Sequence, residues 1–103
     1  MELRGKQKRY LRSQAHHLHP IFQIGKGGLN EEMMIQVSEA LEKRELIKVS
    51  LLQNTDEVAE DVAAVIEKKT GCTVVQIIGR VLVLFKPSSK EKYQKFSKEV
   101  KSI

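Results

Sequence analysis

The chain has 103 residues, of which 41% are hydrophobic and 30% are charged, and its formal net charge is +5. This length allows one domain with a sizeable core, and the composition is that of a soluble globular protein rather than a disordered one. No apolar run approaches the roughly 20 residues that a membrane helix needs, and the basic N-terminus lacks the apolar segment of a secretory signal. The lone Cys72 cannot form an internal disulfide, which predicts a cytoplasmic protein, and we interpret it as a small core residue.

The basic residues are concentrated at the two ends of the chain. Residues 1–20 carry five bases against one acid, and residues 86–103 carry six lysines against two acids. Residues 21–85 carry seven bases and ten acids. Such asymmetry favours a polyanionic partner, with a merely solvated basic surface as the alternative.

The first predicted element is a helix over residues 3–18. A largely apolar stripe recurs along it at helical spacing, formed by Leu3, Gln7, Tyr10, Leu11, Gln14 and Leu18. Arg4, Lys8 and Arg12 stand four residues apart and form a basic ridge beside this stripe. Because like charges at this spacing repel each other by roughly a few tenths of a kcal/mol, helix stability does not explain the ridge, whereas a polyanionic partner does.

Three histidines, His16, His17 and His19, lie where this helix ends before Pro20. A metal site would need further ligands at regular spacing, and the sequence has no cysteine or second ligand pair nearby. We therefore predict no metal and favour phosphate contact or packing at the helix end for these side chains.

A strand over residues 21–24 is followed by the loop Gly25-Lys26-Gly27-Gly28 and by a helix over residues 31–44, for which Asn30 is a suitable N-cap. Glycine lets another molecule approach the backbone, and the free N–H groups of a helix N-terminus favour an anion such as phosphate. The loop has the G-x-x-G form with which KH domains hold a nucleotide backbone, although this spacing is also common in simple turns. It does not match a nucleotide-binding P-loop.

The pattern next predicts a helix, capped by Asn54 or Thr55 and ending near Lys69, and three strands over residues 46–52, 74–78 and 81–85. Gly71 is the expected C-terminal stop of that helix. Its buried stripe is expected to comprise Val58, Val62, Val65 and Ile66. Gly79-Arg80 fits a hairpin turn with glycine first, and the last strand is expected to be central because it is apolar on both faces.

A short final helix is predicted after Pro87. Ser88 and Glu91 have the spacing of a capping box. Tyr93, Phe96 and Val100 form one apolar stripe, and only weak docking or fraying is expected for it. The fold class is therefore α/β, in the order α-β-α-β-α-β-β with a possible last α, and its helices pack on a mixed four-stranded sheet.

The residues favour binding over catalysis. The sequence lacks a recognisable set of nucleophile, base and orienting groups, so we expect no enzyme and predict no cofactor. The aromatic content of 5% argues against a platform that stacks bases. What remains is recognition of a phosphate backbone, with an affinity that depends on salt.

The chain from Leu3 to Pro87 resembles a CRM domain (chloroplast RNA splicing and ribosome maturation) in its stand-alone bacterial YhbY-type form. The matching motifs are Leu3-Arg4-Gly5-Lys6-Gln7-Lys8, Leu11-Arg12, Pro20 followed by Ile24-Gly25-Lys26-Gly27-Gly28, and Ile78-Gly79-Arg80-Val81-Leu82-Val83-Leu84. The resemblance implies a KH-related fold similar to the C-terminal domain of translation initiation factor three. It also implies RNA binding, with association of bacterial members with precursors of the large ribosomal subunit.

The predicted RNA-binding residues comprise the loop, the basic first helix and the turn before the last strand: Gly25, Lys26, Gly27, Gly28, Arg4, Lys6, Lys8, Arg9, Arg12 and Arg80. We expect them to form one distributed basic surface. Residues 1–87 would be the RNA-binding domain, and residues 88–103 a basic tail or short helix of open function.

The leading hypothesis is an RNA-binding ribosome assembly factor of the cytoplasm. The alternative is a protein-interaction adapter that uses the acidic middle helices or the stripe of Tyr93, Phe96 and Val100, with the basic ends contacting an acidic protein. DNA binding stays open because phosphate contacts do not distinguish the sugars.

Overall fold

The computed structural model describes residues 2–103 and confirms the predicted α/β class. Its elements are α1 (Gly5–Ala15), β1 (Pro20–Ile24), α2 (Glu31–Arg44), β2 (Leu46–Leu51), α3 (Ala59–Thr70), β3 (Thr73–Ile78), β4 (Val81–Phe85), the 3-10 helix η1 (Glu91–Tyr93) and α4 (Phe96–Ser102). Within residues 2–103, no helix combines the length and the apolar character needed to cross a membrane.

The strands form one mixed sheet in the order β1-β2-β4-β3. β1 and β2 are parallel and joined through α2, whereas β4 is antiparallel to both of its neighbours. The prediction that the last strand is central is thus confirmed, and residues 82–85 are fully buried. The β3–β4 hairpin turns at Gly79, whose φ of +57° fits a turn that begins with glycine.

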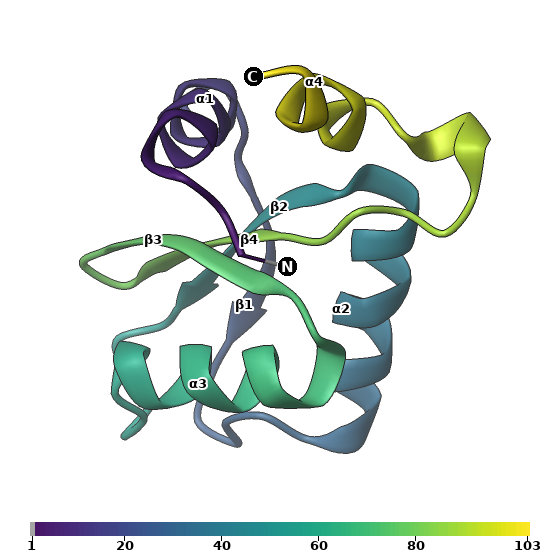
Figure 1. The fold of residues 1–103 in the computed structure, drawn as a ribbon. Coiled ribbons are helices and arrows are strands. Elements are labelled where there is room, and N and C mark those ends of the chain that lie inside the picture. Colours follow the sequence, from purple (N-terminus) through teal and green to yellow (C-terminus); the bar gives the residue numbers. More distant parts are fainter. Residues whose placement is uncertain (1) are drawn as a thin grey trace.

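Helices cover both faces of this sheet, so the domain has three layers (Figure 1). α2 and α3 cover one face, and the core between them and the sheet includes Ile24, Val37, Leu41, Ile66, Cys72, Leu82 and Leu84. α1 and α4 cover the other face, with a core that includes Leu3, Leu11, Ala15, Leu46, Val83, Phe85 and Val100. Alternate residues of β4 serve the two cores, which explains why that strand is apolar on both faces.

Two predicted helix ends are confirmed by their geometry. The side chain of Asn30 accepts a hydrogen bond from the N–H of Met33 at 2.8 Å and caps α2. Gly71 has a φ of +77° and ends α3 in the left-handed conformation. α1 is shorter than predicted, because the chain turns after Ala15.

The prediction for α3 is wrong at its start and in part of its buried stripe. The hydroxyl of Thr55 accepts a hydrogen bond from the N–H of Glu57 at 3.2 Å, and this local turn delays the helix to Ala59. Val58 and Val65 are 54% and 43% exposed. Val62 and Ile66 are buried as predicted, and they are joined by Ala63 and Thr70, which places the centre of the buried face away from Val65.

A buried carboxylate at the end of α2 holds the C-terminal segment in place. Glu45 is fully buried and has a φ of +64°, in the region that favours glycine. Its Oε1 accepts hydrogen bonds from the main-chain N–H groups of Lys95, Phe96 and Ser97 at 2.8, 2.9 and 3.1 Å. Its Oε2 accepts hydrogen bonds from the N–H of Ser88 at 2.8 Å and from the hydroxyl of Ser97 at 2.6 Å.

The end of the chain therefore differs from the prediction. The hydroxyl of Ser88 donates to Glu42 at 3.0 Å instead of forming a capping box with Glu91, and α4 begins only at Phe96. Val100 is fully buried against α1 and the sheet. The final helix is thus docked through a carboxylate clamp and an apolar anchor, in place of the weak docking expected.

Candidate nucleic-acid interface

The G-x-x-G loop forms a tight turn at the N-terminus of α2. The N–H of Gly28 donates to the carbonyl oxygen of Gly25 at 2.9 Å, and Gly28 has a φ of +65°. Lys26 and Gly27 lie exposed at the tip. Leu29 then packs against the core below α2 and α3, so the loop is anchored on both sides and its tip projects from the domain.

The fold requires glycine to a different degree at each of the three glycine positions of this loop. Gly28 needs its positive φ, and a Cβ there would lie 2.7 Å from Oε1 of Glu57. A Cβ on Gly25 would make only an ordinary contact, at 3.5 Å from Cδ1 of Leu52. Gly27 has no left-handed φ, and a Cβ there would meet nothing within 4 Å. The fold thus requires Gly28, whereas Gly27 keeps open a backbone surface that another molecule can approach.

The structure brings Arg80 to the same end of the sheet as the loop. The N–H of Leu52 donates to the carbonyl oxygen of Ile24, just before the loop, at 2.8 Å. A guanidinium N–H of Arg80 donates to the carbonyl oxygen of Leu52 at 3.2 Å. Arg80 is exposed, so its remaining N–H groups can serve a ligand at this end of the sheet.

The bases of α1 lie elsewhere. Gln7, Leu11 and Ala15 bury one side of α1 on the sheet face opposite α2 and α3. Figure 1 accordingly shows α1 above the sheet and the loop between β1 and α2 below it. The basic residues of this helix segment are mostly exposed: Arg4, Lys6, Lys8, Arg9 and Arg12. The predicted single basic surface is therefore divided into two, because α1 packs on the far layer.

The layer that carries the loop is acidic overall. Residues 25–70 contain six bases and ten acids, and the carboxylate of Glu57 lies directly against Gly28. The positive charge near the loop tip comes from Lys26 and Arg80. Close approach and the α2 N-terminus must therefore contribute much of any anion binding at this end.

The three histidines are exposed after α1. The rings of His16 and His17 meet edge to face, with centroids 5.7 Å apart. Within residues 2–103, the structure contains no group of three or more His, Cys, Asp or Glu side chains that could hold a metal ion.

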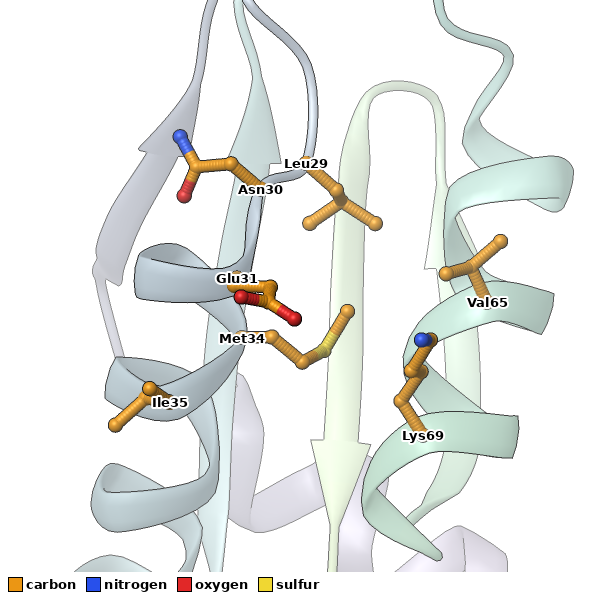
Figure 2. Close-up of a pocket in the computed structure, with 7 residues that line it drawn as sticks. All are labelled: Leu29, Asn30, Glu31, Met34, Ile35, Val65 and Lys69. Atoms are coloured by element: carbon orange, nitrogen blue, oxygen red, sulfur yellow. The ribbon is translucent and has the colours of Figure 1, made fainter.

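An apolar groove between α2 and α3 begins directly after the G-x-x-G loop (Figure 2). Its volume is about 520 Å³, and it is lined by Leu29, Asn30, Glu31, Met34, Ile35, Val65 and Lys69. Ile35 is 58% exposed at its rim. The sequence prediction missed this groove because it placed Val65 in the buried stripe of its helix, whereas Val65 lines the groove.

The fold and the loop define a small α/β domain that presents a G-x-x-G turn between a strand and a helix. Residues 3–86 match the family model of the CRS1 / YhbY (CRM) domain, and the chain belongs to this family. This confirms the resemblance found in the sequence. The division of the chain at residue 87 stays a prediction.

Two similar proteins are named RNA-binding proteins, and a third has a solved structure. The chain is 58% identical over 90 residues to "Probable RNA-binding protein YqeI" of Bacillus subtilis, with 87% of this chain and 94% of that protein covered. It is 38% identical over 92 residues to an "RNA-binding protein" of Haemophilus influenzae, with 89% and 93% covered. The solution structure of the hypothetical protein SAV1595 from Staphylococcus aureus is similar with a TM-score of 0.74 and 48% identity, over 91% of this chain and 98% of that one.

Proposed function

We propose that this protein binds RNA and that the G-x-x-G loop is one of its contact sites. The observation that carries the proposal is Gly27, an exposed glycine that neither its φ nor its surroundings require. It stands beside the exposed Lys26 and near the N-terminus of a capped helix. Family membership and the names of the relatives support RNA as the polyanion.

In this proposal the loop contacts the sugar-phosphate backbone. The open backbone at Gly27 lets a phosphate reach main-chain N–H groups, while Lys26 and Arg80 supply charge. The bases of α1 add attraction that does not depend on sequence and that weakens with salt. The 5% aromatic content gives little capacity for base stacking.

The proposal also specifies which RNA the protein binds. The resemblance to the YhbY-type proteins supports ribosomal RNA in precursors of the large ribosomal subunit, and hence a role as a cytoplasmic assembly factor. The protein would act by binding, without catalysis.

The test is a double variant, Lys26→Asp with Gly27→Asp, assayed on fragments of large-subunit ribosomal RNA. Both positions are exposed, so circular dichroism should stay native while most of the affinity is lost. A matched control, Lys68→Asp with Ala64→Asp, makes the same charge change on the exposed side of α3. An affinity unchanged in the loop variant would remove the loop from the mechanism, and matched DNA as competitor checks the preference for RNA.

The apolar groove between α2 and α3 favours a second candidate, a protein-interaction adapter. Its exposed Ile35 and Val65 lie on the acidic layer, where a basic, apolar segment of another protein would fit. The other adapter surface considered is largely occupied within the domain, because Val100 is buried and Phe96 is partly buried in the core under α1 and α4, which leaves Tyr93 as its half-exposed member. A complex that survives RNase during purification would favour the adapter.

A further inference from the structure

The C-terminal helix is fixed alongside α1. The side-chain amide of Gln7 donates to the carbonyl oxygen of Val100 at 2.9 Å, and the guanidinium of Arg4 donates to the main-chain oxygen of Ile103. Burial, together with the carboxylates of Glu99 and Glu45, raises the pKa of Tyr10, as expected for a side chain between the two helices. The Glu45 carboxylate clamp fixes the other end of α4.

This docking gives α4 a defined basic face. Ser97 and Val100 are the buried residues of α4. Lys95 at the N-cap position, and Lys98 and Lys101 within the helix, recur at every third position and are all exposed. Because α1 and α4 cover the same sheet face, their exposed sides point away from the sheet in the same general direction (Figure 1).

The two terminal segments that contain these helices are strongly and similarly charged. Residues 2–20 carry five bases against Glu2, and residues 86–103 carry six lysines against Glu91 and Glu99. Within residues 2–103 there is one ion pair, between Lys98 and Glu91 at 3.9 Å, and both of its side chains are largely exposed. The ammonium groups of Lys92 and Lys95 also lie over the rings of Tyr93 and Phe96, at 5.0 and 5.3 Å from the ring centroids. All three of these lysines are nevertheless exposed, so they can still meet an external polyanion.

Gly5 provides an independent sign of contact on the same layer. It occupies the first position of α1, directly after the N-cap residue Arg4. Its φ is not left-handed, and a Cβ there would meet nothing within 4 Å. Gly5 is flanked in the sequence by Arg4 and Lys6. Like Gly27, it is a glycine next to a base at a position where the fold does not require one.

We propose that α1 and α4 together form a second RNA-binding surface, which binds a different segment of the RNA from the one at the G-x-x-G loop. This inference rests on the proposed RNA binding. α4, through Lys95, Lys98 and Lys101, completes a surface that α1 alone forms only in part. Its ligand is a sugar-phosphate backbone.

The separation of the two surfaces follows from the layers. The loop lies on the α2 and α3 side of the sheet, and α1 and α4 lie on the other side. The domain measures 40 × 24 × 22 Å along its principal axes. A straight RNA helix touches only one side of a body of this thickness, so the two surfaces would hold two segments of a folded RNA.

The test uses the whole chain and a triple variant, Lys95→Gln, Lys98→Gln and Lys101→Gln. The matched control, Lys43→Gln, Arg44→Gln and Lys68→Gln, removes the same charge from exposed positions of α2 and α3. Affinity for large-subunit ribosomal RNA fragments is measured over a series of salt concentrations, and hydroxyl-radical footprinting maps the protected nucleotides. The Lys26→Asp, Gly27→Asp variant is footprinted on the same RNA.

We expect the α4 variant to lose about tenfold or more in affinity at physiological salt, with a slope of log K against log salt smaller by about 2 to 3. In footprinting, the α4 variant should no longer protect some nucleotides that the loop variant still protects. Equal losses in the α4 variant and the control would overturn the proposal, because net charge alone would then explain the effect. Loss of the same protections in both site variants would refute two separate segments. If the wild-type chain itself bound no RNA, the proposed function would fail and this inference with it.

Discussion

Replacing Glu45 by glutamine removes the charge of the carboxylate clamp while keeping its shape. The wild-type side chain has no exposed surface and accepts hydrogen bonds from four N–H groups and one hydroxyl. In the variant, one oxygen can still serve the N–H groups at the start of α4. The amide nitrogen then faces the N–H of Ser88, so that donor loses its acceptor.

The expected loss in the free energy of unfolding is about 2–4 kcal/mol. A buried donor without a partner costs about 1–3 kcal/mol, and hydrogen bonds to a charged acceptor are stronger than neutral ones. The positive φ of Glu45 gives a second comparison. Glu45→Gly relieves backbone strain of about 1–2 kcal/mol, so it should be more stable than Glu45→Ala and still less stable than the wild type.

Urea unfolding at neutral pH measures the global loss, and amide hydrogen exchange locates it. Exchange should accelerate most at Phe96, Ser97 and Val100, since the clamp holds the start of α4. The control is Glu91→Gln, whose exposed ion pair contributes little. Wild-type stability and unchanged exchange in Glu45→Gln would refute the clamp.

The clamp also makes a prediction about pH. Burial alone would raise the pKa of Glu45, but the hydrogen bonds from Ser97, Ser88 and Lys95 outweigh it, and the pKa is lowered. A lowered pKa in the folded state means that the stabilisation is complete above the unfolded pKa of about 4.3 and is lost as the pH falls through the folded pKa. The difference in stability between the wild type and Glu45→Gln should therefore shrink on acidification below about pH 4.

Three further outcomes are expected. Gly28→Ala should destabilise the domain by about 1–2 kcal/mol in urea unfolding because of its φ and the contact with Glu57, whereas Gly27→Ala should stay within about 0.5 kcal/mol of the wild type. Burial raises the pKa of Cys72 above its usual value, so a thiol reagent should react with it slowly in the native protein and rapidly in denaturant. Leu11→Ala should cost about 2–5 kcal/mol in thermal or urea unfolding, because Leu11 is fully buried between α1 and the sheet.

The sequence predicts those parts of the fold that depend on local chemistry. Asn30 caps α2 and Gly71 ends α3, since each signal acts within a few residues. The central place of β4 follows from its apolar residues on both faces. In the candidate site, the exposed tip at Lys26 and Gly27 follows in the same way from the glycine pattern.

The parts that could not be predicted depend on contacts between distant segments. Glu45 looks like a solvated charge at a helix end, and its burial arises from donors that lie 43 to 52 residues further along the chain. Val65 has the spacing of a core residue, but the late start and the packing of α3 turn it to the groove. The separation of α1 from the loop is likewise set by which sheet face each helix covers, which helical periodicity does not encode.

This separation has an electrostatic consequence. At 0.1 M salt the Debye length is about 10 Å, which is less than the 22 Å of the shortest principal axis. The bases of α1 and α4 therefore act on their own side, and the acidic α2 and α3 layer does not cancel them. RNA should first meet the basic layer, through long-range attraction that salt suppresses. Binding at the loop, with Lys26, Arg80 and an open Gly27, depends more on close contact. Loop substitutions should thus weaken RNA binding even at high salt, whereas substitutions on α4 should matter most at low salt.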